Sequence, residues 1–389
     1  MSRLAKAIQL CWWAALITLT LLVGAGEGAE LGLELPPALA LLAPSLKLLL
    51  IFWGSAAFVL PISPRAPSIS GCLLAALLLL QLITWRRAEQ DRGAPPSPSA
   101  PRLRLLSWNV GRLGESARQR SIEIPRRVLC AKELLAASSF DALALQEISA
   151  RRLAELQVEL ALRCRQVDYL GTGALDLGGL AICVPREGPW RLRRSRSLPL
   201  RGEWHALFGE LYQGSYVVNL LSLHLPPPRL HGAQLQTAVR ALAAGESSPL
   251  EAFFSEWSRA THAQLQETAA LLERIAHLED PTILAGDFNS AEGSLVHQRL
   301  RESWLSGWRA AGSGLGATRW LGWLPLRIDH IYLSRSDLYP EEVEIIESGC
   351  SDHLPLSATL IPRRPISGEA EETSSLVDQE SHEPGDPVQ

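Results

Sequence analysis

The chain has 389 residues, which is enough for one large domain with further segments attached. Its formal net charge of −4 excludes a global positive field of the kind that draws proteins to nucleic acid. The six cysteines include no C-x-x-C pair, which argues against a thioredoxin-like motif or a zinc site of that type. Cys11 and Cys72 fall in apolar runs; the others are candidates for buried thiols whose pairing the sequence leaves open, namely Cys130, Cys164, Cys183 and Cys350.

Three apolar stretches begin the chain, and each approaches the roughly 20 residues that a membrane-spanning helix requires. They are Ala7–Gly24, Leu46–Ile62 and Ile69–Trp85. We therefore predict about three transmembrane helices within residues 1–92, with the lipid bilayer as a partner. A cleaved signal peptide is the alternative for the first stretch, because Arg3 and Lys6 precede it and small residues follow it.

The charges around these stretches indicate how the chain is oriented in the membrane. Arg3 and Lys6 suit a cytoplasmic start, and three spans would then place the rest of the chain outside the cytoplasm. Arg86, Arg87 and Arg92 follow the third stretch and argue for the opposite orientation. We predict a multi-pass protein of the cell membrane whose large domain is extracytoplasmic.

Composition divides the remainder of the chain into three parts. Residues 93–101 read GAPPSPSAP, which predicts a linker without a core. Residues 363–389 are acidic and polar, with interspersed proline and glycine, which predicts a disordered tail. Residues 102–362 form the predicted globular domain.

Strands and helices alternate along this domain. The strands are short, apolar runs: Arg104–Trp108, Ala142–Leu145, Gly179–Val184, His205–Tyr212, Tyr216–Leu223, Thr282–Ala285, Ile328–Leu333, Glu342–Ile346 and Leu356–Leu360. The helices are Ile122–Ala137, Ala150–Arg163, Ala260–Leu278 and Leu295–Glu302. Many strands with fewer helices predict two packed sheets with helices outside, an α/β sandwich. The segment Pro226–Arg259 is predicted as a long loop with a short helix, of the kind that covers or contacts a substrate.

Five short motifs place polar residues next to these apolar runs. They are Ser107-Trp108-Asn109-Val110, Leu145-Gln146-Glu147-Ile148, Leu223-His224-Leu225, Gly286-Asp287-Phe288-Asn289 and Ser351-Asp352-His353-Leu354-Pro355. Alone, Glu147 is typical of a surface carboxylate and Asn109 of a turn. Together the motifs put costly polar groups beside a core, and a divalent cation with a phosphate would satisfy all of them. Oxygen-rich ligands suit Mg²⁺ or Mn²⁺ rather than zinc.

In this order, the motifs resemble those of the endonuclease/exonuclease/phosphatase superfamily, which includes DNase I-like nucleases, sphingomyelinases and inositol-phosphate phosphatases. The resemblance covers about Arg102–Pro362. It implies a DNase I-like four-layer α/β/β/α sandwich. It also implies a metal-dependent phosphoric ester hydrolase, in which water attacks a phosphomonoester or phosphodiester with the help of the metal.

The resemblance further implies a role for each motif residue, beginning with the metal ligands. Glu147 would be the principal ligand, assisted by Asn109 and Asp352.

The catalytic roles follow from the same resemblance. Asp287 would orient or deprotonate the attacking water, and Asn289 would hold a phosphate oxygen. His224 would donate to the phosphoryl group, and His353 would contact the scissile phosphate with Asp329 orienting its ring. Whether Asp287 or His353 is the general base stays open at this point.

Several residues outside the motifs receive a structural interpretation. His330 adjoins Asp329 but is predicted to face the opposite side of the strand. His297 is given no role. Arg319 and Trp320 are assigned either to the rim of the site or to loop packing.

The substrate is the most open question at the sequence level. Apolar stretches followed by this domain resemble a membrane-anchored bacterial branch of the superfamily, and tethering beside headgroups favours a lipid-linked phosphate or pyrophosphate. A Mg²⁺-dependent nuclease is the alternative, but the basic run Arg191–Arg196 has only Trp190 as an aromatic neighbour and is better interpreted as a solvated strand. An inactive membrane scaffold is a second alternative, disfavoured because no motif residue is visibly lost.

Overall fold

The computed structural model describes residues 93, 95–111, 123–171, 178–201, 204–228, 234, 237–238, 240–241, 248–321 and 324–365. The three apolar stretches in residues 1–92 and all but the start of the predicted tail lie outside the described residues. Within those ranges, no helix combines the length and the apolar character needed to cross a bilayer. The structure therefore concerns the globular domain.

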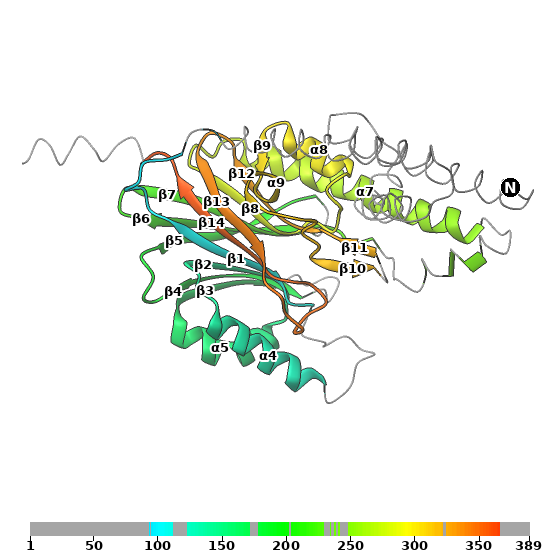
Figure 1. Cartoon of the computed structure of the whole chain (residues 1–389), viewed down its shortest axis with the longest axis horizontal. Helices are drawn as coiled ribbons and strands as arrows, with labels where there is room; N and C mark the ends of the chain where they lie inside the picture. Colours follow the sequence, from blue (N-terminus) through cyan, green and yellow to red (C-terminus); the bar gives the residue numbers. More distant parts are fainter. Residues whose placement is uncertain are drawn as a thin grey trace, which may run out of the picture.

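Two six-stranded sheets form the centre of the domain (Figure 1). The first, in order β13-β14-β1-β2-β4-β3, contains β1 (Leu103–Asn109), β2 (Ala142–Ile148), β3 (Cys164–Gly171), β4 (Gly179–Pro185), β13 (Leu338–Ile345) and β14 (Leu356–Pro362). The second, in order β5-β6-β7-β8-β12-β9, contains β5 (Arg191–Pro199), β6 (His205–Gln213), β7 (Tyr216–His224), β8 (Thr282–Asp287), β9 (Trp304–Ser306) and β12 (Asp329–Ser334).

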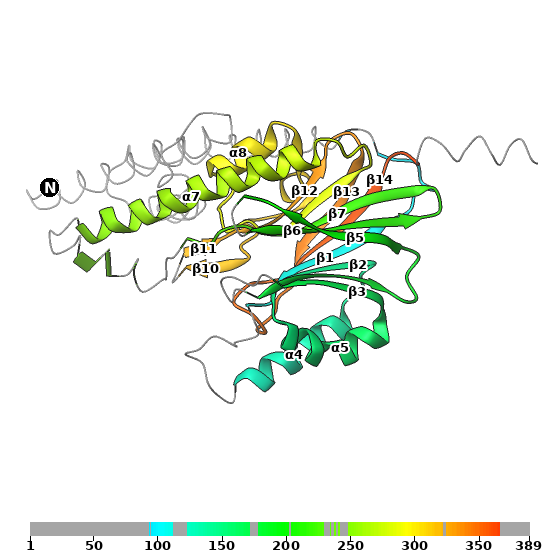
Figure 2. The ribbon, with the colours of Figure 1, turned by 180° about the vertical axis from the view of Figure 1, so that it is seen from behind.

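Helices cover the outer faces of the two sheets, as Figures 1 and 2 show. The helices are α4 (Glu123–Ala137) and α5 (Ala150–Arg163) on the first sheet, and α7 (Ser248–Ile275) and α8 (Leu295–Arg301) on the second. A short helix, α9 (Gly307–Ala311), follows β9. This arrangement confirms the predicted α/β/β/α sandwich.

The central strands are buried on both faces, which explains why their sequences are continuous apolar runs. In β1, Leu103 and Leu105 point into the core between the sheets, whereas Leu106 and Trp108 pack on the side of α4 and α5. The same alternation in the other central strands gives each sheet one face toward its partner sheet and one toward helices. The polar residues at the strand ends are thereby fixed at one edge of a rigid core.

The observed elements differ from the predicted ones mainly at the sheet edges. The structure adds β3, β9 and α9, together with a separate hairpin of β10 (Arg319–Leu321) and β11 (Leu324–Leu326). Strands of three residues are held by their neighbours and leave no periodic pattern in the sequence. The prediction of a loop across Pro226–Arg259 is wrong at its end, because α7 already begins at Ser248 with Pro249 in its first turn, where proline is tolerated.

Two disulfide bonds correct the interpretation of four cysteines as thiols. Cys130 of α4 is bonded to Cys350, and Cys164 is bonded to Cys183 across the β3–β4 pair. Sequence could not pair them, because the pairing depends on the approach of elements as far as 220 residues apart. The first bond ties an outer helix to the segment that leads into His353.

Candidate active site

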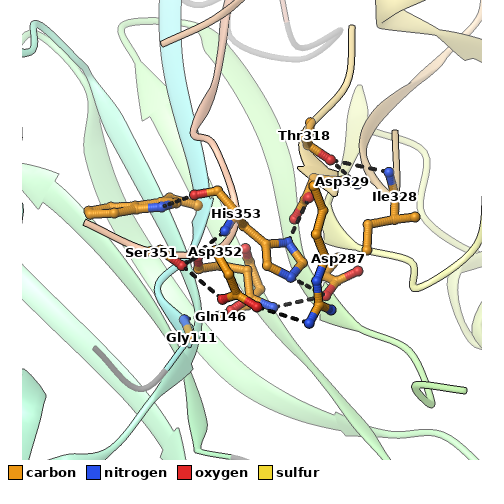
Figure 3. Close-up of polar contacts among 12 residues, drawn as sticks. Gly111, Gln146, Asp287, Thr318, Ile328, Asp329, Ser351, Asp352 and His353 are labelled. Carbon is orange, nitrogen blue, oxygen red and sulfur yellow. Dashed lines mark hydrogen bonds and ion pairs between the residues drawn. The ribbon is translucent and has the colours of Figure 1, made fainter. Parts of the chain in front are cut away.

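The polar motifs converge because parallel strands lie side by side in each sheet. Strand β1 is parallel to β2, with Asn109 opposite Gln146, and β7 is parallel to β8, with His224 opposite Asp287. The carboxyl ends of four strands therefore meet at one edge of the sandwich, where α/β folds place their sites. Figure 3 shows Asp287, Asp329 and His353 gathered there.

Glu147 reaches this edge through an irregular backbone. Its φ of 52° lies in the left-handed region, and the pairing of β2 with β4 shifts register between Leu145 and Ile148. A side chain on Gly178 would clash with the Glu147 backbone, since its Cβ would lie 2.6 Å from the Glu147 carbonyl carbon. A non-glycine residue held in this conformation costs free energy and is a common feature of functional sites.

Asn109 lies between the two carboxylates of the site. Its side-chain nitrogen donates to Glu147 Oε1 at 3.1 Å and to Asp287 Oδ2 at 2.8 Å. Its side-chain oxygen accepts from the Gly111 backbone N–H at 2.9 Å. Asn109 is fully buried, so these bonds fix the separation of the two acidic groups.

His353 and Asp329 form a buried pair beside Asp287. His353 Nδ1 lies 2.8 Å from Asp329 Oδ2, and its Nε2 lies 3.8 Å from Asp287 Oδ2. Burial by itself lowers the pKa of His353, but the carboxylates of Asp329 and Asp287 outweigh burial and raise that pKa to about 9. At neutral pH His353 is therefore a cation whose Nε2 faces the site.

Asp287 is the most buried carboxylate of the site, with no exposed surface. Burial, followed by the nearby charge of Asp329, raises the pKa of Asp287 to about 6, against the opposing positive charges of His353 and His224. Its Oδ1 accepts from the Asn289 backbone N–H at 2.7 Å. At neutral pH Asp287 is ionised, yet basic enough to take a proton.

Asn289 adopts a left-handed conformation with a φ of 50° and is held by two neighbours. Its side-chain nitrogen donates to the Leu225 carbonyl at 2.9 Å. Gln264 of α7, itself buried, donates to the carbonyls of both Pro226 and Asn289 at 2.9 Å. The helix thereby joins the segments that follow His224 and Asp287, a contribution that the sequence did not reveal because a polar residue on a helix usually faces water.

Three side chains have the chemistry of a divalent-cation site. Ligand atoms of Glu147, His224 and Asp287 lie within 4.8 Å of one another. His224 Nε2 is buried without a hydrogen-bond partner and lies 3.4 Å from Glu147 Oε1 and 3.8 Å from Asp287 Oδ2. A buried nitrogen without a partner beside two carboxylates fits a cation held between these groups. A second such group, Asp287 with Asp329 and His353, shares the same central carboxylate.

Asp352 lies apart from these clusters. Its Oδ2 accepts from Arg319 Nη2 at 2.9 Å, and 53% of its side chain is exposed. Neither of the two groups of potential ligands includes Asp352. The assignment of Asp352 as a metal ligand stays a prediction. Arg319 lies at the rim of the site, which agrees with one of its two predicted roles.

The remaining histidines near this edge belong to the core. His330 follows Asp329 in β12 but faces the opposite side, where its Nε2 donates to the carbonyls of Ser290 and Arg327. His297 of α8 lies against it, with ring centroids 4.1 Å apart. The prediction for His330 is confirmed, and His297 proves to be fully buried.

Comparison with known proteins places this geometry in a family. The sequence profile of the Endonuclease/Exonuclease/phosphatase family matches residues 106–353, which contain nearly the whole of the motif set. No curated protein matches the chain in sequence.

Solved structures with a similar fold include three proteins of low sequence identity. The endonuclease/exonuclease/phosphatase from Bacteroides vulgatus is 13% identical, with a TM-score of 0.51, covering 67% of this chain and 99% of that chain. D. rerio TDP2 complexed with single strand DNA product is 15% identical, with a TM-score of 0.50, covering 67% and 98%. The human Nocturnin catalytic domain with bound sulfate anion is 18% identical, with a TM-score of 0.48, covering 69% and 100%.

The first two structures show that the fold is shared. The profile match spans well over half of the chain and runs from the middle of β1 to His353. The chain belongs to the endonuclease/exonuclease/phosphatase family, whose members typically hydrolyse phosphoesters.

Proposed function

We propose that this protein is a membrane-anchored phosphoesterase that depends on a divalent cation, Mg²⁺ or Mn²⁺, and that hydrolyses a lipid-linked phosphate ester. The observation that supports hydrolysis most strongly is the convergence of Asn109, Glu147, His224, Asp287 and the His353–Asp329 pair at one edge of the sandwich. Burying polar and charged groups costs free energy, and clusters of such groups are typical of sites that act on a substrate.

Two side chains have separate roles in hydrolysis: Asp287 acts as the general base, and the charged imidazole of His353 stabilises the phosphoryl group. Asp287 accepts a proton from the attacking water, whose oxygen bonds to phosphorus while the bond from phosphorus to the leaving oxygen breaks. His353, charged at neutral pH, donates from Nε2 to a phosphoryl oxygen, and Asp329 holds the ring in place through Nδ1. Their pKa values, about 6 for Asp287 and about 9 for His353, favour Asp287 as the general base.

The cation would be held by Glu147, with His224 and Asp287 in reach. When bound, it would neutralise the phosphate charge and orient the phosphorus for in-line attack. Asn109 donates to both carboxylates and so holds them near each other against their mutual repulsion in the absence of the cation. Asn289 is assigned to a phosphate oxygen, next to the Asp287 carboxylate that holds its backbone.

Charge placement argues against nucleic acid as the substrate. The basic run Arg191–Arg196 lies on the edge strand β5, where Arg194 pairs with Glu210. Arg191 is opposite Tyr212, at the end of the second sheet farthest from His224. This run therefore offers no groove that leads a polyanion to the site.

Three features support a lipid-linked substrate on the extracytoplasmic side. The apolar stretches in residues 1–92 would hold the domain beside headgroups, which raises their effective concentration. Trp320, next to Arg319 in the β10–β11 hairpin, leaves 53% of its surface exposed near the site and offers apolar contact to lipid. Disulfides persist in oxidising compartments, and Cys130–Cys350 and Cys164–Cys183 are consistent with that location.

A substrate panel tests this function. The full-length protein in lipid nanodiscs would be given an isoprenyl phosphate, an isoprenyl pyrophosphate, a phospholipid and single-stranded DNA, with Mg²⁺ or with a chelator. We expect Mg²⁺-dependent hydrolysis of a lipid-linked phosphate, lost in the chelator and in Asp287→Asn. Hydrolysis of DNA alone would overturn the assignment of a lipid-linked substrate. If none of the compounds is hydrolysed, the assignment of the protein as a hydrolase is overturned.

A separate experiment tests the orientation. Two fusions would be compared in cells, each with a reporter attached after Pro365. One reporter is active only outside the cytoplasm, and the other is active only inside it. We expect the outside reporter to be active. Activity of the inside reporter would place the domain in the cytoplasm and contradict the disulfide argument.

A further inference from the structure

Backbone and side-chain hydrogen bonds connect the base of the β10–β11 hairpin to the segments that carry His353 and Asp329. The Thr318 carbonyl accepts from the Leu354 N–H at 2.8 Å, and the Thr318 hydroxyl accepts from the Asp329 N–H at 3.2 Å. Arg319 then forms a backbone bridge with His353. Figure 3 shows Thr318 beside Asp329 above the ring of His353. The first residue of the hairpin is thus held in register with both members of the His353–Asp329 pair.

The Arg319 guanidinium extends from this fixed base to the mouth of the site. It donates to Asp352, with 38% of the Arg319 side chain and 53% of the Asp352 side chain exposed. After burial and the neighbouring carboxylates, the Arg319 charge is among the causes that set the pKa of Asp287 and of His353, and it lowers both. Arg319 therefore acts electrostatically on the groups that would meet the substrate.

The partner of Arg319 is easily exchanged. An exposed ion pair contributes little to stability, because water already solvates both charges well. A phosphate offers a guanidinium two acceptor oxygens and up to two negative charges, which suits the planar fork of arginine better than a mobile surface carboxylate does. Asp352 then serves as a placeholder that keeps the guanidinium extended toward the mouth.

We propose that Arg319 is a substrate-binding residue that exchanges Asp352 for the non-bridging oxygens of a terminal phosphate, so that the site prefers phosphomonoesters and pyrophosphates over diesters. The proposal rests on the proposed function and narrows its substrate class. A diester carries one negative charge, whereas a terminal phosphate carries between one and two at neutral pH. The positive charge of Arg319, in addition to that of His353, would recognise the second negative charge of a terminal phosphate.

Matched substrates provide the test. Kinetic constants would be measured for p-nitrophenyl phosphate and for methyl p-nitrophenyl phosphate, which share a leaving group and differ in one charge. In Arg319→Gln we expect KM for the monoester to rise by about 10- to 100-fold, with the diester KM changed by less than about threefold. Arg319→Lys restores part of the monoester affinity, because it returns the charge without the fork. Equal changes for both substrates, or no change, would overturn the proposal.

Asp352→Asn supplies the complementary variant. Removing the competing carboxylate leaves Arg319 available, so we expect KM for the monoester to fall by a few-fold. A rise in that KM, or a loss of kcat together with weaker Mn²⁺ binding, would show that Asp352 is a ligand of the cation and would overturn the exchange.

Binding measurements separate this proposal from the proposed function. Calorimetry with inorganic phosphate and with pyrophosphate would compare wild type and Arg319→Gln, with thermal melting as the check on folding. Weaker binding in the variant supports the Arg319 site even if no ester is hydrolysed, in which case only the hydrolase assignment fails. Unchanged binding in a folded variant of an active enzyme would overturn the Arg319 assignment and leave the hydrolase intact.

Discussion

Buried histidines lie on both faces of strand β12, His353 on one and the group of His297 and His330 on the other, and their pKa values shift in opposite directions. On one face, His353 is paired with Asp329 and lies near Asp287, and these carboxylates raise the pKa of His353 to about 9 despite burial. On the other face, burial lowers the pKa of His297 to about 3 and that of His330 well below its ordinary value. Burial is common to both groups, so the partners decide the charge.

The hydrogen-bond partners of the second group are neutral, and the nearby charges that lower its pKa values belong to Arg301 and Arg327. His297 Nε2 lies 2.8 Å from the Ser290 carbonyl, and its Nδ1 lies 2.9 Å from the Tyr332 hydroxyl. A carbonyl acceptor and a hydroxyl satisfy both nitrogens of an uncharged imidazole. In this domain, the buried histidine faced by carboxylates is a candidate for chemistry, and those faced by carbonyls, a hydroxyl and arginines are packing residues.

Removing the central carboxylate is expected to have the largest effect. Asp287→Asn keeps the shape of the side chain but loses the proton acceptor that lies between His224 and His353. We expect kcat for phosphoester hydrolysis to fall by about 10²- to 10⁴-fold. The matched control is His330→Gln, on the other face of β12, whose kcat should remain within about threefold of wild type provided that the variant folds. Equal losses in the two variants would show that the two faces do not differ in function.

The pair of His353 and Asp329 predicts a pH profile. Wild-type activity should fall as His353 loses its proton near pH 9. The acid limb reports the ionisation of Asp287, whose pKa is about 6 without a cation and is lower with a cation bound beside it. Asp329→Asn removes a charge that raises the pKa of His353, so the alkaline limb should move to lower pH and kcat should fall by about 10- to 100-fold. A profile whose alkaline limb is the same in both proteins would contradict the assignment.

The disulfide beside the His353 segment predicts a loss of stability on reduction. Replacing Cys130 and Cys350 with alanine should lower the free energy of unfolding by about 2–5 kcal/mol, measured by urea denaturation. The control is the pair Cys164–Cys183, whose cysteines are only 19 residues apart in sequence. Replacing this pair with alanine should lower the free energy of unfolding by a smaller amount. A larger loss in the control would show that loop length does not govern these bonds.

The neutral histidines predict a dependence of stability on acidity. The unfolded chain binds protons at His297 below its ordinary pKa of about 6.5, whereas the folded chain does not until about pH 3. The unfolded state therefore binds more protons in this window, and stability falls as pH falls, with a slope that corresponds to about one proton at His297. In His297→Gln the slope of unfolding free energy against pH should be shallower by that amount. An unchanged slope would mean that His297 is charged in the folded protein.

The sequence was sufficient to predict the central strands and the residues that end them. Asp287 and Glu147 each follow a run of buried apolar residues, and such runs leave a pattern whether or not the fold is known. The ordered motifs then indicated that these ends would meet. Parallel pairing of β1 with β2 and of β7 with β8 is the structural reason that they do.

Other features depend on contacts that no local pattern records. Gln264 joins two segments of the site from α7, in which Thr261, Glu267 and Thr268 are buried as well. Arg319 reaches the mouth only because three-residue strands pair and bridge to His353. The disulfide partners, the burial of His297 and the left-handed backbone of Glu147 likewise arise from tertiary approach rather than from propensity.

Calorimetric titration with Mn²⁺ tests whether Glu147 holds a divalent cation, with His224 and Asp287 in reach. Glu147→Gln keeps the volume of the side chain and removes one charge from the cluster. We predict saturable binding of Mn²⁺ to wild type and at least about tenfold weaker binding to Glu147→Gln, with the same melting behaviour in both proteins. Equal affinity in the two proteins, or no binding to wild type, would show that Glu147 holds no cation.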